Sequence, residues 1–341
     1  MDKVGFGTGY DPATGVAEVA ALAARAEEAG FDLCFFSEAA RLLRDGPSAL
    51  SAMALSTQRI GLGAVQVVRL RTPAVMAQTI ATLDELSGGR LMIAPGACSP
   101  GAAARHGLSP ADPGQGLIEY IDSIRLLLSG EQVSYQGQVV AFENVQLGWK
   151  PIRSDIPLLP ASTSRKGLRI AGMTGDGVLL DACASPEYSA NAIAVIRQAA
   201  EEAGRDWSKF IIAQIISCSI EDDRATALDA VRWEVATKLT PASHRFQRYR
   251  IAVGEPHMNV DDFPAFERAF ERGGKMGLLE AVPDSYVEGV TASGTPDDVQ
   301  RRVAEYRAAG VQLPIVRPAA VHQADRLLAL FGRRGAVPLS S

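Results

Sequence analysis

Residues 60–98 constrain the fold more than any other part of the chain, because they predict two buried strands joined by a capped helix. Residues 61–68 and 91–94 are apolar runs of strand length. Between them, the pair Thr72-Pro73 is typical of a helix start, and a Gly-Gly pair is typical of a helix end. Two buried strands connected through a helix form a β-α-β unit, which favours a parallel sheet.

The same alternation recurs along the chain and predicts eight strands. The apolar runs cover residues 4–7, 31–36, 61–68, 91–94, 156–160, 177–182, 210–219 and 312–316. Most are followed by a helical pattern, and 341 residues are enough for eight such units. We therefore predict an α/β fold, a (β/α)8 TIM barrel. A doubly wound open sheet is the alternative, but the GFGTGY motif of the first strand opens no helix on its third glycine.

Residues 1–341 are predicted to form a single barrel domain that carries one insertion. Residues 240–290 are polar, broken by Pro and Gly and weakly helical, without a clear strand. We place the insertion there, before the last βα unit. A loop is predicted over residues 95–116, followed by a helix over 117–129 and a small hairpin over 132–142.

Charge and composition exclude several classes of partner. A net charge of −5 gives no electrostatic reason to expect nucleic acid or an anionic membrane. No apolar run approaches the length that spans a bilayer, and the N-terminus lacks the apolar core of a signal peptide, so we expect a cytoplasmic protein.

The cysteines give no sign of a metal site or a disulfide. Cys34, Cys98, Cys183 and Cys218 lie far apart and show no Cys-x-x-Cys spacing, and the histidines show no metal spacing either. We expect buried, inert thiols. For Cys98 and Cys183 the alternative is that they line a pocket.

In a barrel of this kind the chemistry lies at the carboxyl ends of the strands, so candidate residues can be read from the sequence. Residues 162–166 follow the fifth strand and place three hydroxyls and two cations at the start of a helix, where backbone N–H groups favour an anion. Ordinary helix capping with solvated charges is the alternative.

Two residues are candidates for proton transfer. Glu38 ends an otherwise apolar strand, where partial burial would raise its pKa; it is either catalytic or a cap of the next loop. His106, in the predicted loop after the fourth strand, is either a general acid or a lone surface histidine.

Arg69 and Arg71 either reach an anionic ligand or are solvated. No nucleophile elbow, P-loop or HExxH motif occurs, which favours chemistry carried by a cofactor.

The segment RTPAVMAQTIATLDELSGGRLMIAPGAC closely resembles the corresponding stretch of the bacterial-luciferase-like superfamily of flavin- and coenzyme F420-dependent oxidoreductases. The nearest branch is that of the methylenetetrahydromethanopterin reductases. The resemblance extends through AEEAGFD, GDGVLLDACASPE and SGTPDDVQRRVAEYRAAGV. It implies a barrel with an insertion, a homodimer, and an isoalloxazine-type ring at the mouth of the barrel.

By position, this resemblance also implies a cis peptide at Ala64-Val65 that supports the ring, and a contact of Val67 with it. The strand ends and the resemblance together assign these residues to the cofactor: Ser37, Ala64, Val65, Gln66, Gly96, Ala97, Cys98, Ser162, Thr163, Ser164, Arg165, Lys166, Gly167, Ala182, Cys183 and Ala184.

The chain departs from the family pattern at two places. Relatives that use F420 usually carry Asp-His after the second strand, where this chain has Glu38-Ala39, and the reductase branch has acidic residues where this chain has Gly7-Thr8. Our first hypothesis is an F420-dependent oxidoreductase that transfers a hydride between the deazaflavin and a C=C or C=N bond of a small substrate. The alternatives are an FMN-dependent luciferase-like monooxygenase and a binding barrel without catalysis.

Overall fold

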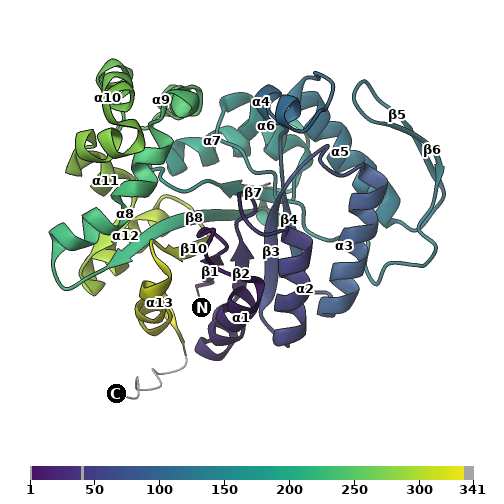
Figure 1. Cartoon of the computed structure of the whole chain (residues 1–341). Helices are drawn as coiled ribbons and strands as arrows, with labels where there is room; N and C mark the ends of the chain where they lie inside the picture. Colours follow the sequence, from purple (N-terminus) through teal and green to yellow (C-terminus); the bar gives the residue numbers. More distant parts are fainter. Residues whose placement is uncertain (1, 40–41, 334–341) are drawn as a thin grey trace.

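Parallel strands form a barrel in the computed structural model, which describes residues 2–39 and 42–333 (Figure 1). The strands pair in the order β4-β3-β2-β1-β10-β8-β7. Isolated bridges of Leu158 to Ile93, and of Ala161 to both Gly96 and Leu179, join β4 to β7 and close the ring. The bounds are β1 Gly5–Thr8, β2 Leu33–Phe36, β3 Gly61–Val67, β4 Leu91–Gly96, β7 Gly177–Leu180, β8 Ile211–Ile220 and β10 Leu313–Pro318.

This closure confirms the predicted TIM barrel, because an open sheet would leave β4 and β7 as edges. All eight predicted strands have a counterpart, with residues 158–161 in the place of the fifth. Ten helices accompany the barrel in the described residues. They are α1 Val16–Ala29, α2 Gly46–Ser56, α3 Pro73–Ser87, α4 Pro100–Arg105, α5 Pro113–Leu128, α6 Arg165–Thr174, α7 Pro186–Glu202, α8 Arg224–Lys238, α12 Pro296–Ala308 and α13 Ala324–Phe331.

The residues that the sequence indicates as helix caps form the expected hydrogen bonds in the structure. The Thr72 hydroxyl accepts from the Val75 N–H at the start of α3, and Gly88 ends that helix at φ 68°. Thr295 and Asp298 form a reciprocal capping box at the start of α12. The predicted hairpin is β5 (Val133–Gln136) with β6 (Ala141–Val145), and a short strand β9 (Ala292–Gly294) pairs in parallel with the end of β8.

The prediction of a loop over residues 95–116 was wrong in part. Residues 100–105 form α4, and α5 begins at Pro113 rather than near 117. Each helix has a capping side chain, Ser99 or Asp112, directly before a proline at the first helical position. The Gly- and Ala-rich composition of this stretch obscured both starts.

Residues 240–290 are more helical than the sequence suggested. They contain α9 (His244–Val253), α10 (Phe263–Ala281) and α11 (Asp284–Val290), which lie together beside α8 in Figure 1. Phe263, Phe266 and Leu278 are buried in one cluster with side chains of α8, so tertiary packing stabilises helices that local propensity supports weakly. Within α10, Gly274 has φ 60° and interrupts the helix.

Apolar side chains fill the middle of the barrel. Phe35, Leu159, Leu179, Ile215 and Ile315 belong to one buried cluster. This layer separates the carboxyl ends of the strands from their amino ends. No helix in the described part of the chain is both long and apolar enough to span a membrane.

Candidate active site

Glu38 lies just beyond β2 in a network of polar side chains. The Gln66 amide on β3 donates to Glu38 Oε2, and Arg71 Nη1 lies 3.8 Å from Glu38 Oε1. Arg71 Nη1 also donates to Gln66 Oε1 at 2.8 Å, and Arg71 pairs with Asp45 at the start of α2. The carboxylate is therefore held by the neighbouring strand and the loop that follows it.

Burial raises the pKa of the Glu38 carboxyl from its ordinary value of 4.5 to about 7, and this effect outweighs the lowering by Arg71. A carboxyl with a pKa near neutrality can hold or release a proton at physiological pH. Glu38 also accepts a backbone hydrogen bond from Gly46 at the start of α2, next to Asp45, whose side chain caps that helix. Both sequence interpretations of Glu38 thus have a structural basis.

His106 shares a cavity with Glu38. The cavity has a volume of ≈ 290 Å³, and its lining residues come from the loops after β2, β3 and α4. They are Glu38, Leu43, Arg44, Asp45, Leu70, Arg71 and His106. The sequence had suggested that His106 is a loop residue. In the structure it is instead the exposed C-terminal cap of α4. The two residues proposed for proton transfer therefore meet at one cavity.

The expected cis peptide at Ala64-Val65 is absent: the peptide bonds of the described residues are all trans. β3 pairs with β4 through both residues, Ala64 with Ile93 and Val65 with Ala94, and with β2 up to Ala64, which pairs with Phe36. These ladders keep the backbone extended, and a cis bond costs about 3–4 kcal/mol without a proline. Ala64 is buried in the cluster between the barrel and its helices, and Gln66 is engaged with Glu38 and Arg71.

The residues at the end of β4 have small side chains or none. Gly96 is the last residue of the strand, Ala97 is exposed, and Cys98 is buried. Gly96 also bridges to Ala161, so the ends of β4 and of residues 158–161 lie side by side.

Residues 162–167 form the amino end of α6. Ser164 is the helix cap and its hydroxyl accepts from Gly167 N–H at 3.1 Å. A Cβ atom at Gly167 would lie 2.9 Å from Ser162 Oγ, so the absence of a side chain there allows the close turn. Arg165 is exposed, whereas Lys166 pairs with Asp112 at 3.1 Å. Helix capping uses the hydroxyl of Ser164 only. Ser162 and Thr163 place two further hydroxyls at this end of the helix.

Residues 182–184 follow β7 and lie next to that helix end, because Ala161 bridges to Leu179. Ala182, Cys183 and Ala184 are buried, and Cys183 has a left-handed backbone with φ 54°. In the described part of the chain the N–H groups of Cys183 and Ala184 have no protein acceptor. Two adjacent loops thus present backbone donors and hydroxyls.

All four cysteines are free and buried. Burial raises the pKa of the Cys34, Cys183 and Cys218 thiols to about 12, so they stay protonated. Cys98 and Cys183 line neither of the two cavities described here. No three His, Cys, Asp or Glu side chains of the described residues are grouped as metal ligands.

The sequence prediction missed a buried ion pair at the same end of the barrel. Arg317 on β10 pairs with Glu234 on α8 and donates to Ser217 Oγ on β8 at 3.0 Å. A Cβ atom at Gly7 would lie 2.8 Å from Arg317 Cβ, so the Arg317 side chain requires the glycine on β1. The sequence does carry a signal for this residue, because Arg317 lies within the apolar run LPIVRP. The candidate residues taken from strand ends did not include those of this last strand.

Unpartnered hydroxyls lie beside this pair. The Tyr10 ring packs 5.6 Å from the Arg317 guanidinium, and burial raises the pKa of its phenol well above the ordinary value. Tyr10 OH, Thr8 Oγ1 and Ser37 Oγ are buried and have no hydrogen-bond partner among the described residues. Thr8 is the last residue of β1, and Ser37 directly follows the adjacent strand β2. Buried hydroxyls normally find a partner, so these three are able to hydrogen-bond to water or to a ligand.

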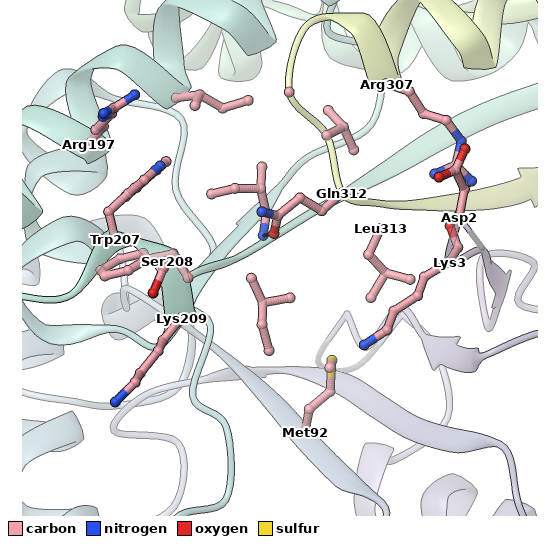
Figure 2. A pocket seen from close by; sticks show the side chains of 16 residues that line it. Asp2, Lys3, Met92, Arg197, Trp207, Ser208, Lys209, Arg307, Gln312 and Leu313 are labelled. Carbon is pink, nitrogen blue, oxygen red and sulfur yellow. Dashed lines mark hydrogen bonds between the residues drawn. The ribbon is translucent and has the colours of Figure 1, made fainter.

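A larger cavity lies at the opposite end of the barrel. Its volume is ≈ 830 Å³, and Figure 2 shows Trp207, Lys209, Arg307 and Lys3 around it, with Met92 and Leu313 from the starts of strands. Two of its four cations pair with carboxylates: Arg197 with Glu201 and Lys209 with Asp206, both on the exposed surface. Size alone favours this cavity, but the unpartnered buried hydroxyls and the carboxyl with a raised pKa lie at the carboxyl ends of the strands.

Comparison with known proteins gives consistent results. The model of the luciferase-like monooxygenase family matches residues 3–313. The 5,10-methylenetetrahydromethanopterin reductase of Archaeoglobus fulgidus is 32% identical over 287 residues, which cover 84% of this chain and 85% of that protein. The F420-dependent glucose-6-phosphate dehydrogenase of Nakamurella multipartita is 26% identical, over 94% of this chain and 91% of that protein.

The solved coenzyme F420-dependent tetrahydromethanopterin reductase of Methanopyrus kandleri has a TM-score of 0.82 and 24% identity, with 98% of each chain covered. It confirms the predicted fold. Together with the family model, which covers most of the chain, and the Archaeoglobus relative, these findings show that the protein belongs to the luciferase-like monooxygenase family.

Proposed function

We propose that this protein is a coenzyme F420-dependent oxidoreductase that transfers a hydride between the deazaflavin and a C=C or C=N bond of a small organic substrate. The observation that carries the proposal is the convergence, at one end of the barrel, of two donor-rich loops, unpartnered buried hydroxyls and Glu38. The names of the related proteins, which include an F420-dependent dehydrogenase, support the cofactor.

The loops at 162–167 and 182–184 would hold the phosphate-bearing tail of the cofactor. The amino end of α6 offers the positive end of its helix dipole, and Arg165 adds an exposed charge. Cys183 and Ala184 offer N–H groups that lack a protein acceptor among the described residues. An anion bound between the loops would satisfy all of these donors.

The cofactor ring would lie across the strand ends, where Ser37, Val65, Gly96 and Ala97 are found. Small residues at the end of β4 leave room for a planar group, and the Ser37 hydroxyl lacks a partner in the described chain. When bound, the deazaflavin ring supplies the two electrons as a hydride, which leaves orientation and proton supply to the protein. Ala64 and Gln66 would support the ring from behind through β3 and the Glu38 network.

Glu38 and His106 are the residues that we propose to handle the proton. They share a cavity, and the pKa of about 7 allows the Glu38 carboxyl to be protonated near neutral pH. They would replace the Asp-His pair that is usual in F420-using relatives.

Cofactor titration of the purified protein tests the proposal. We expect F420 to bind with quenching of its fluorescence, and FMN to bind far more weakly. Tight FMN binding without F420 binding would favour the monooxygenase that the family description suggests. Binding of neither cofactor would favour a barrel without catalysis.

We also propose a homodimer that forms through α2 and α3. These neighbouring helices expose Leu55, Val75 and Leu86, with Leu55 71% exposed. Burial of such side chains between two copies would stabilise a dimer. Light scattering should give twice the chain mass, and Leu55→Glu should shift it to the monomer mass.

A further inference from the structure

We propose that Arg250 and Glu255, both from the 240–290 insertion, are positioning residues that orient the backbone donors of the loop at 181–185. The inference rests on the proposed function, which assigns this loop to the phosphate-bearing part of the cofactor. It makes the insertion a structural part of the cofactor site.

Arg250 on α9 binds three consecutive residues of the loop. Its Nη1 donates to the Cys183 carbonyl, and its Nη2 donates to the Ala182 carbonyl at 3.0 Å and to Asp181 Oδ2 at 2.7 Å. The Arg250 side chain is only 1% exposed. A buried arginine with a planar fork of donors holds its acceptors in a defined geometry.

Glu255, just after α9, binds the last residue of the loop, Ser185. Its Oε2 accepts from the Ser185 N–H at 2.8 Å, and its side chain is buried. Ser185 in turn caps α7, where its hydroxyl accepts from the Tyr188 N–H at 3.1 Å. The insertion therefore holds the loop at both ends.

These contacts decide which way the free donors point. In a trans peptide the C=O and N–H groups point in opposite directions. The Ala182 carbonyl shares a peptide plane with the Cys183 N–H, and the Cys183 carbonyl shares one with the Ala184 N–H. Because Arg250 binds both carbonyls, it turns both N–H groups away from the insertion.

The left-handed backbone of Cys183, with φ 54°, lies between the Cys183 and Ala184 N–H groups. Successive N–H groups around such a residue form an anion-binding nest. Lys238 and Arg250 are balanced by Asp181 and Glu255, so the N–H dipoles rather than net charge supply the attraction. A non-glycine residue at positive φ needs support from its surroundings, and Arg250 provides it.

The test compares Arg250→Met, Arg250→Lys and Glu255→Ala with the control Arg245→Met, which removes an exposed arginine from the same helix. Two quantities are measured on the full chain: the dissociation constant for F420 from fluorescence quenching, and hydrogen exchange of the 181–185 amides with and without F420. Thermal unfolding is recorded for every variant.

We expect Arg250→Met to weaken F420 binding at least tenfold and to abolish the F420-dependent protection of the Cys183 and Ala184 amides. Arg250→Lys keeps the positive charge but loses the planar fork of donors, so we expect a smaller loss of affinity. If Arg250→Met does not fold, Arg250→Lys replaces it in the comparison. Glu255→Ala should weaken binding as well, and the control should stay within twofold of the wild type.

The inference is overturned if the wild type binds F420 and the Arg250 and Glu255 variants bind it equally well, even with lowered melting temperatures. That result would assign these residues to stability alone. Absence of F420 binding by the wild type would instead reject the proposed function, so the two failures are distinguishable.

Discussion

The two ends of the barrel differ in how their polar groups are satisfied. At the amino ends of the strands the cavity is large, ≈ 830 Å³, but most of its charges are exposed, and two of them, Arg197 and Lys209, pair with carboxylates. At the carboxyl ends the cavity is ≈ 290 Å³, yet buried ion pairs, a carboxyl with a raised pKa and unpartnered hydroxyls gather there. Burial of unsatisfied polar groups therefore distinguishes a candidate site better than cavity volume does.

The physical reason is the cost of desolvation. A charge in contact with water needs no protein partner, whereas a buried hydroxyl or charge without one is destabilising by about 1–3 kcal/mol or more. A chain retains such groups where something else satisfies them, such as a ligand. The apolar layer in the middle of the barrel keeps the two ends separate, so that substitutions can test each end independently.

The largest effect should come from the ion pair at the carboxyl ends. Arg317→Met leaves the Glu234 carboxylate without its partner, and we expect the free energy of unfolding to fall by about 3–5 kcal/mol in chemical denaturation. The double variant with Glu234→Gln should recover part of the loss. A loss below about 1 kcal/mol in the single variant would contradict the contrast between the two ends.

A pH-dependent effect should come from Glu38. Its folded-state pKa of about 7 lies above the ordinary 4.5, so the folded protein binds the proton more tightly. Stability that is fully present below pH 4.5 is then lost as the pH rises towards 7, by on the order of 3 kcal/mol. Glu38→Gln should remove this slope in denaturation experiments at pH 5 and pH 8. An unchanged slope would show that the carboxyl is not the responsible group.

A binding effect should come from the start of α6. Replacement of Arg165 and Lys166 by Ala should weaken F420 binding by about 1–3 kcal/mol if they face a phosphate. Arg169→Ala is the matched control, because Arg169 lies further along the same helix and pairs with Glu202. Equal affinities of the double variant and the control would reject an anion site there.

The smallest effect should come from the opposite end. Lys209→Met should change the free energy of unfolding by no more than about 0.5 kcal/mol, since its pair with Asp206 is exposed. F420 affinity should stay within twofold, as measured by fluorescence quenching. A large loss of affinity would move the candidate site to the amino ends of the strands.

Much of the fold was predictable because its signals are local. Thr72, Ser185 and Thr295 each accept a hydrogen bond from an N–H three residues away, and apolar runs of strand length lie between the helices. Together with the rule that barrel chemistry lies at the carboxyl ends, these signals indicated Glu38, His106 and the loops at 162–166 and 182–184, and the family resemblance added Gly167. The helix at 100–105 was missed, and residues 240–290 were expected to be only weakly helical, because caps and tertiary contacts compensate for weak local patterns.

Long-range packing determined which polar groups meet. Arg250 contacts Cys183 across 67 positions, and Arg317 contacts Glu234 across 83. Hydrophobic periodicity and helix caps act within a few residues, so the amino-acid order alone specifies strands, helices and the barrel they favour. A buried charge and its partner are brought together by how those elements pack, and no local pattern encodes that pairing. This is why the barrel could be predicted from the sequence, whereas the ion pairs at its mouth could be identified only from the three-dimensional structure.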